Sequence, residues 1–291
     1  LRRARAQLKG KGFKGAVGTG AGYAELLGAE RLEDFEQRLS ERLDLPFFPV
    51  ATQVYPRKQD YRVIGALAGL GGSLYRFAFD LRVLQSPPIG ELSEPFGGRQ
   101  VGSSAMPFKR NPINAEKIDS LGRALAQMPR LAWDNAAHSL LERTLDDSAN
   151  RRTLLPEAFL TADELLRVSA RLVEGLQVDR SAIERNLAAY GPFAAVERVL
   201  MALAKAGADR QAMHERLRQH AMEAWQAAPE QRGEALTARI QDDPAIRRYV
   251  DSTELQELMN ARAHVGDAPR RARALAEEIR RSLQVSGESA N

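Results

Sequence analysis

Residues 57–85 have the sequence RKQDYRVIGALAGLGGSLYRFAFDLRVLQ, and this stretch decides the fold class. Its large apolar residues recur at alternating spacings of four and three, at Val63, Leu67, Leu70, Leu74, Phe77, Leu81 and Leu84. Such spacing is typical of a long helix packed in a bundle. Each glycine within the helix costs about 1 kcal/mol relative to alanine. We therefore expect neighbouring helices to approach closely at Gly65, Gly69, Gly71 and Gly72.

Two further long helices are predicted downstream. One carries the seam Ile118, Leu121, Leu125, Met128 and Ala132 and follows Asn111-Pro112, where Asn is expected to cap the helix and Pro to occupy its first position. The other extends from about residue 150 to residue 176. Upstream, a single helix is predicted from about residue 24 to residue 43. Together these segments predict an all-α protein.

The sequence changes character after Val178. Helical periodicity continues, but turn signals recur at Gly191-Pro192, Gly207, Pro229, Asp243-Pro244 and Gly266. We predict a central helical-bundle domain over residues 1–178 and a smaller helical C-terminal domain over residues 179–291. The apolar stripes of the long helices are too broad for a single partner, so a homo-oligomer is expected.

Composition narrows the class of protein. The 291 residues contain no cysteine, which excludes disulfides and thiolate metal sites. No apolar run approaches the roughly 20 residues of a membrane span, and the N-terminus does not resemble a signal peptide. We expect a cytoplasmic protein without a membrane partner. The net charge is +4, and the arginines are not interleaved with stacking aromatics, which disfavours nucleic-acid binding.

Residues 97–117, GGRQVGSSAMPFKRNPINAEK, form a loop between two periodic helices. Its glycines favour mobility, Ser103 and Ser104 supply hydroxyls, and Lys109 supplies a cation beside a helix N-terminus, where unpaired N–H groups favour an anion. An ordinary connecting loop can have the same composition. The residues alone leave both interpretations open.

Within this loop, GSSAMPFKRNP resembles the signature of the fumarase/aspartase superfamily, whose members eliminate fumarate or a related product from a substituted succinate. LERTLDDSANRR (141–152) and EAFLTAD (157–163) are similar to segments of the adenylosuccinate lyase family. The similarity also includes ATQVYPRK (51–58), GFKGAVGTGAG (12–22) and AKAGADRQAMHERLR (204–218), and so covers essentially the whole chain.

The resemblance implies the fold and the reaction. The fold is a long-helix bundle forming a homotetramer with sites shared between subunits. The reaction is cleavage of adenylosuccinate to AMP and fumarate, and of SAICAR to AICAR, in purine biosynthesis, with no cofactor or metal. It also implies catalytic histidines in a part of the family's sequence that precedes Leu1. Since none of the histidines present (His138, His214, His220 and His264) matches a family motif, we expect this chain alone to be inactive.

Catalytic roles are carried over by matching positions. Ser103 matches the general base, which works in a mobile loop, and Ser104 beside it is expected to contact substrate. Lys109 and Asn111 match groups that bind the succinyl carboxylates and stabilise the aci-carboxylate formed on proton removal. Glu116 matches a glutamate that supports a catalytic histidine. Charged residues are also common in a first helical turn, so a purely structural role stays open for Glu116 and for Lys117 beside it.

Substrate-binding roles follow in the same way. Lys117 matches a basic ligand-binding position, and Gln53 matches a glutamine that contacts the succinyl group. Arg143, Ser148 and Arg152 match residues that hold the phosphate of the nucleotide. The alternative for this last group is that Asp147 or Ser148 merely caps the third long helix, while the arginines pair with neighbouring acids.

Two other functions are compatible with the serine loop. Argininosuccinate lyase and carboxymuconate cycloisomerase share the loop but bind no nucleotide phosphate. A non-catalytic helical scaffold is the alternative from a different class.

Overall fold

The computed structural model describes residues 1–96, 106 and 109–288, with side chains as far as residue 284. The chain forms two compact units, Leu1–Val178 and Asp179–Asn291. Both are built from helices, so the all-α prediction is confirmed. The strands in the described ranges are β1 (Leu92–Ser93) and β2 (Gln177–Val178), which pair antiparallel in the first unit.

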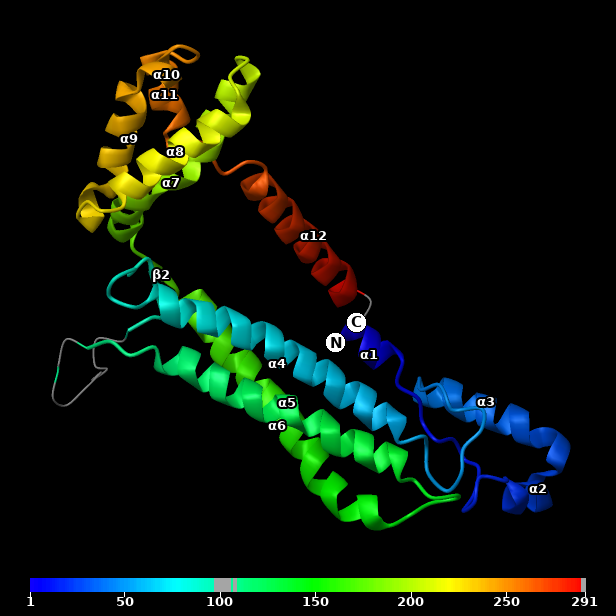
Figure 1. Ribbon diagram of the computed structural model, residues 1–291. Helices are drawn as coiled ribbons and strands as arrows, with labels where there is room; N and C mark the ends of the chain where they lie inside the picture. Colours follow the sequence, from blue (N-terminus) through cyan, green and yellow to red (C-terminus); the bar gives the residue numbers. More distant parts are fainter. Residues whose placement is uncertain (97–105, 107–108, 289–291) are drawn as a thin grey trace. The chain divides into compact units, whose positions relative to one another are not determined.

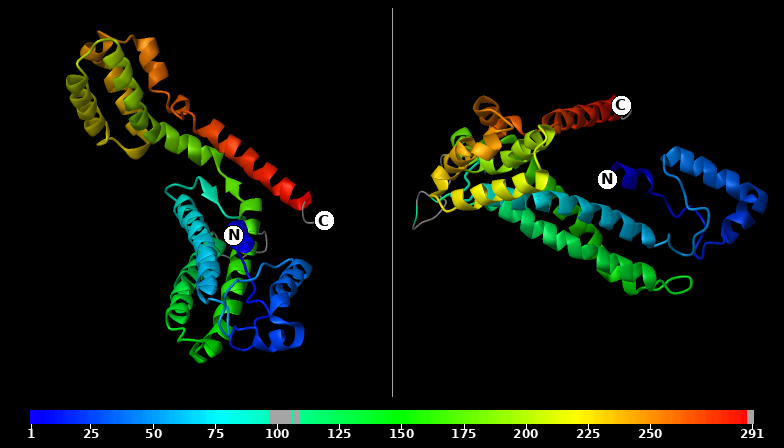
Figure 2. Two further views of the ribbon diagram at one scale, coloured as in Figure 1. Left: turned by 90° about the vertical axis from the view of Figure 1, so that its right-hand side faces the viewer. Right: turned by 45° about the horizontal axis from the view of Figure 1, so that its top comes forward.

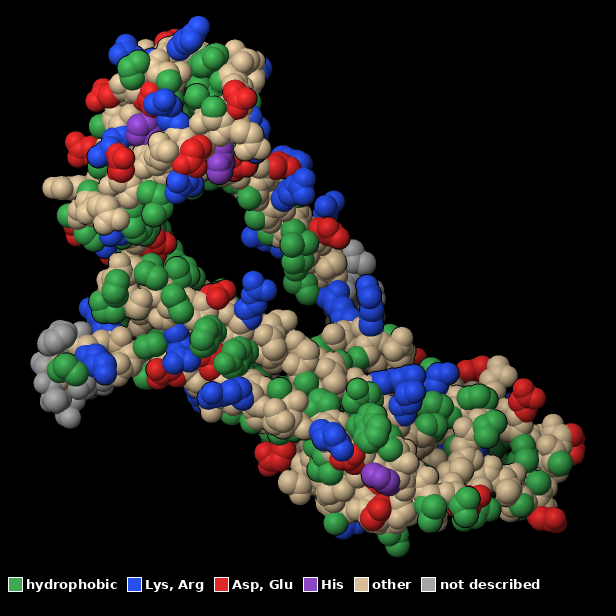
Figure 3. Space-filling model, viewed as in Figure 1, with side chains coloured by type: hydrophobic (Ala, Val, Ile, Leu, Met, Phe, Trp, Pro, Cys, Tyr) green, Lys and Arg blue, Asp and Glu red, His purple; other side chains and the backbone are tan. Residues whose placement is uncertain are grey.

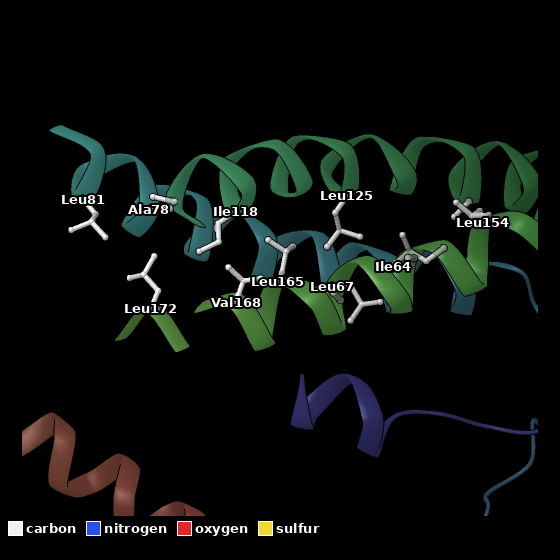
Figure 4. Close-up of a cluster of buried hydrophobic side chains, with 14 residues drawn as sticks. Ile64, Leu67, Ala78, Leu81, Ile118, Leu125, Leu154, Leu165, Val168 and Leu172 are labelled. Carbon is white, nitrogen blue, oxygen red and sulfur yellow. The ribbon is translucent and has the colours of Figure 1, made fainter. Parts of the chain in front are cut away.

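The first unit is a bundle of α4 (Lys58–Leu84), α5 (Ile113–Ala137) and α6 (Asp146–Glu174), which lie side by side in both sets of views (Figures 1 and 2). Their facing side chains form one core (Figure 4), which includes Ile64, Leu67, Ala78, Leu81, Ile118, Leu125, Leu154, Leu165, Val168 and Leu172. The buried stripe of α4 departs from the predicted seam, because Ile64 and Ala78 are buried where Val63 and Phe77 were expected.

The glycines of α4 do not all meet a neighbouring helix. A Cβ added at Gly71 would lie 3.8 Å from Cα of Gly122 on α5, so the predicted close approach occurs there. Around Gly65, Gly69 and Gly72 no described atom would lie within 4 Å of an added Cβ. The expectation of close packing is therefore wrong for these three within one chain, because they lie on faces of α4 that α5 and α6 do not cover.

The segment before the bundle contains α1 (Arg2–Ala6), α2 (Ala21–Leu27), the 3-10 turn η1 (Ala29–Arg31) and α3 (Leu32–Leu43). The single helix predicted from about residue 24 to 43 is wrong. Gly28 interrupts it with φ 88°, a left-handed conformation that ends α2.

In the described part of the chain, the second unit contains six α-helices and two 3-10 turns: α7 (Arg180–Lys205), α8 (Arg210–Ala224), η2 (Pro229–Gln231), α9 (Arg232–Asp242), α10 (Pro244–Arg247), α11 (Ser252–Leu258), η3 (Ala261–Ala263) and α12 (Ala268–Glu288). The carboxylates of Asp179, Asp209, Asp243 and Asp251 each accept an N–H from the first turn of the helix that follows. These caps explain where α7, α8, α10 and α11 begin.

The turn expected at Gly191-Pro192 is absent, because α7 continues through both residues. Gly191 lacks the Cβ that would lie 2.7 Å from Cβ of Ala261, and this close packing holds the helix intact. By length and composition alone, α7 could also cross a membrane. Its Val199 and Leu203 are fully buried in the core of the second unit, as in the core helix of a globular domain.

Candidate functional site

A groove of about 740 Å³ lies where the end of α4 meets the residues that precede α5. Lys109, Asn111 and Glu116, three of the residues predicted to serve the reaction, line it together with Phe79 and Arg82 of α4. The structure therefore brings a cation, an amide and a carboxylate into one groove.

Ser103 and Ser104, the predicted general base and its neighbour, lie outside the described residues. Lys109 is described and exposed. Its backbone N–H donates to the carbonyl oxygen of Met106 over 2.9 Å, four residues before the start of α5.

The N-terminus of α5 differs from the prediction. The helix begins at Ile113 with Pro112 at the N-cap position, so Asn111 lies one residue too early to cap it. The capping group is the carboxylate of Glu94, which accepts the backbone N–H groups of Asn114 (3.0 Å) and Ala115 (3.1 Å). These N–H groups are therefore not free for a substrate anion, because a buried carboxylate of the chain already binds them.

Arg82 is a groove residue that sequence reasoning missed. One of its terminal nitrogens donates to Oδ2 of the buried Asp119 over 2.7 Å, and the other lies 3.9 Å from Oε1 of Glu116. The hydrogen bond to Asp119 raises the pKa of Arg82 above its usual value. Arg82 thus holds the Glu116 carboxylate beside a permanent positive charge.

Lys117 lies on the exposed side of α5 and pairs with Glu164 of α6. The hydrogen bond from Lys117 lowers the pKa of Glu164. Both side chains are accessible to solvent, so an anionic ligand can compete with Glu164 for the ammonium group.

The other predicted residues lie at the start of α6, which begins at Asp146, four residues earlier than expected. Ser148 and Arg152 are one turn apart on the same face of the helix. The Nε atom of Arg143 is buried and has no hydrogen-bond partner among the described residues. The capping alternative is wrong at both positions, because neither Asp147 nor Ser148 makes a side-chain cap in the described helix.

Asp147 instead belongs to a buried network that sequence reasoning missed. Its Oδ2 accepts from Nε of Arg57 over 2.6 Å. Nearby, Arg151 donates to Oδ2 of Asp60 and to the hydroxyl oxygen of Tyr55, and the Tyr55 hydroxyl donates to Oδ1 of Asp60, each over 2.7 Å. Burial, followed by the hydrogen bond to Asp60, raises the pKa of Tyr55. The sequence did carry one indication of this network, because all five residues lie in or beside the segments 51–58 and 141–152, which resemble segments of the lyase family.

Gln53 is exposed and lies two residues before Tyr55, so the network places it at the same end of the bundle as Ser148 and Arg152. Lys109 lies at the opposite end. The two ends are separated by the length of α5, whose 25 residues span roughly 37 Å. One chain therefore holds two separate groups of predicted site residues.

The histidines do not complete either group. In the described part of the chain none of them lines the groove with Lys109. His220 is partly buried, and its Nε2 lies 2.7 Å from Oδ2 of Asp243. This pairing is structural, since the same aspartate caps α10.

Comparisons with known proteins identify relatives of this chain. Residues 192–275 match the family described as adenylosuccinate lyase C-terminus, and residues 1–125 match the family described as lyase. Adenylosuccinate lyase of Schizosaccharomyces pombe is 36% identical over 92% of this chain and 55% of its own length. The enzyme of Saccharomyces cerevisiae is 37% identical with the same coverage.

Among solved structures, the 3-carboxy-cis,cis-muconate lactonizing enzyme of Pseudomonas putida superimposes with a TM-score of 0.77 at 26% identity, covering 96% of this chain and 60% of that one. The chain thus spans about half the length of the curated relatives it matches.

Proposed function

Because the chain belongs to the adenylosuccinate lyase family of the fumarase/aspartase superfamily, we propose that it serves the β-elimination of fumarate from adenylosuccinate, giving AMP. The same site would release fumarate from SAICAR, giving AICAR. These reactions belong to purine biosynthesis, and a cytoplasmic location is part of the proposal.

The elimination breaks a C–H bond and a C–N bond, forms a C=C bond and an N–H bond, and involves two proton transfers. A base, proposed to be Ser103, takes a proton from the succinyl Cβ, and the electron pair forms the double bond of fumarate as the C–N bond breaks. The leaving nitrogen takes up a proton. Lys109 supplies positive charge where the aci-carboxylate develops, and Asn111 adds a polar group in the same groove.

The observation that carries the proposal is the cationic group at the start of α6. A guanidinium nitrogen of Arg143 is buried without a partner in the described chain, and Arg152 is exposed one helical turn from Ser148. Two guanidinium groups and a hydroxyl suit a phosphate monoester. A substrate without phosphate leaves these groups unexplained.

Substrate is proposed to bind between copies of the chain. An elongated nucleotide is far shorter than α5, which spans roughly 37 Å and separates the end with Lys109 from the end with Ser148. We therefore propose that the two ends of one site come from different subunits. The bundle also exposes apolar side chains, among them Phe79, Trp133 and Phe159, and Figure 3 shows such side chains over its visible face. A homotetramer would cover them.

A cycloisomerase-type lyase is the second candidate, favoured by the similarity of the backbone to that of the muconate lactonizing enzyme. Its substrate would carry carboxylates but no phosphate. Such a protein would have no use for the arginines at the start of α6.

Calorimetric titration of the purified chain with adenylosuccinate tests the proposal. We expect binding that AMP or inorganic phosphate competes away. Since no histidine lines the groove with Lys109 in the described chain, we expect no turnover by these 291 residues alone. Binding of a phosphate-free tricarboxylate with no binding of adenylosuccinate would contradict the proposal and favour the second candidate.

A further inference from the structure

Five buried or half-buried residues link the segment containing Gln53 to the first turns of α6. Arg57 and Asp147 form an ion pair in which both side chains are almost fully buried. Tyr55, Asp60 and Arg151 form a closed triangle of hydrogen bonds, each 2.7 Å long. The guanidinium groups of Arg57 and Arg151 also lie 4.9 and 5.8 Å from the centre of the Tyr55 ring.

The network contains equal numbers of positive and negative groups. Arg57 and Arg151 are balanced by Asp60 and Asp147. Burial lowers the pKa of Arg151, but the hydrogen bond to Asp60 and the nearby negative charges together keep that pKa raised. A network whose charges balance does not attract phosphate itself, although Oδ1 of Asp147 is buried without a hydrogen-bond partner among the described residues. Its role must be to hold its neighbours.

Those neighbours are residues of the proposed site. Arg151 lies next to Arg152 and three residues after Ser148, so fixing Arg151 fixes the rotation of α6 that directs both toward a ligand. Tyr55 lies two residues after Gln53. Anchoring its hydroxyl to Asp60 and Arg151 holds one end of the Gln53 segment.

The other end of the segment is held by a close backbone contact. A Cβ added at Gly18 would lie 1.9 Å from the carbonyl oxygen of Ala51. The glycine-rich segment is therefore pressed against Ala51, two residues before Gln53. Gln53 is exposed between two fixed points.

We propose that Tyr55, Arg57, Asp60, Asp147 and Arg151 are positioning residues that set the distance between Gln53 and the Ser148–Arg152 pair. This spacing selects nucleoside monophosphates whose base carries a dicarboxylate, because such a ligand must reach both places at once. The inference rests on the proposed function and deepens it. It assigns the choice between a complete nucleotide substrate and a phosphate alone to residues that do not contact the ligand.

Tyr55→Phe tests the inference, because it removes one hydroxyl from the network and leaves the ring. The matched control is Tyr61→Phe, at an exposed position of α4. Each variant is titrated with adenylosuccinate and, separately, with inorganic phosphate, and its urea midpoint is measured. Phosphate needs only Arg143, Ser148 and Arg152, whereas adenylosuccinate also needs Gln53 in place.

We expect Tyr55→Phe to weaken adenylosuccinate binding by about tenfold, the loss of roughly one hydrogen bond to charged partners, and to leave phosphate binding within about twofold. Asp60→Asn is expected to act in the same direction, and Tyr61→Phe should change neither affinity. A merely structural role would weaken both ligands together with the urea midpoint.

Equal weakening of the two ligands, or no change in either, overturns the positioning role while the proposed function stands. If the unaltered chain binds phosphate but not adenylosuccinate, both the proposed function and the positioning role of the five residues are contradicted.

Discussion

The buried carboxylate of Glu94 accepts the backbone N–H of Ala115 over 3.1 Å and so occupies the N-terminus of α5 from within the chain. The helix terminus beside the groove is therefore already neutralised. In this account, positive charge for a substrate carboxylate comes from the side chains of Lys109 and Arg82, which line the groove.

Glu94→Gln is expected to lower the free energy of unfolding by roughly 1–3 kcal/mol, because the amide replaces a charged acceptor of buried N–H groups and turns a donor toward them. Urea denaturation followed by circular dichroism measures the change. Glu142→Gln, at an exposed position, is the control. An unchanged midpoint for Glu94→Gln would show that the cap is not needed.

Gly18→Ala is expected to destabilise the first unit by roughly 1–3 kcal/mol. The added Cβ would meet the carbonyl oxygen of Ala51, and φ is 81° at this position. Gly22→Ala is the matched control, since it lies within α2 with open space around it; there alanine should stabilise the helix by up to about 1 kcal/mol. The melting temperatures of the two variants should shift in opposite directions. A shift in the same direction for both would argue against the close contact between Gly18 and Ala51.

Arg152→Ala is expected to weaken nucleotide binding by roughly 10- to 100-fold, the range for one charge-assisted hydrogen bond to phosphate. Stability should barely change, because Arg152 is exposed. Arg171→Ala, also at an exposed position of α6, should leave the affinity unaltered. Equal losses in the two variants would mean that only long-range charge matters and that no phosphate site exists at this end.

The raised pKa of Tyr55 predicts a dependence of stability on alkaline pH. The folded state keeps the phenolic proton at pH values where the unfolded chain has lost it. The stabilisation is therefore complete below about pH 10 and is lost as the pH rises through the folded-state pKa. Denaturation between about pH 9 and 11.5 should show the unaltered chain losing stability faster than Tyr55→Phe, whereas parallel curves would exclude a raised pKa.

The three long helices could be predicted from the sequence because their apolar seams are long and regular. Their ends could not, since capping depends on residues distant in sequence. The N-terminus of α5 is capped by Glu94, some 20 residues away, and Asp147 is held by Arg57, 90 residues away. Gly191-Pro192 resembles a turn locally, yet packing against Ala261 keeps the helix continuous.

The candidate site was predictable in part. Motif resemblance located Lys109, Asn111 and Glu116, which the structure places in one groove. Arg82 was missed because it lies on a long helix beside the apolar seam, and an arginine at such a position is usually a solvated surface residue. No sequence pattern could indicate that Lys109 and Ser148 lie at opposite ends of one bundle, since that follows from the antiparallel course of α5 and α6.

The central claim is that one nucleotide is held by Lys109 of one copy and by Arg143, Ser148 and Arg152 of another. Mixing two variants that are each deficient in binding tests this claim. Lys109→Ala and Arg152→Ala are each expected to bind adenylosuccinate weakly as pure proteins. After the two are unfolded together and refolded at equal concentrations, about one quarter of the sites should regain full affinity, because each intact end is drawn from half of the molecules. A mixture that binds no better than either variant alone would contradict sharing of the site between copies.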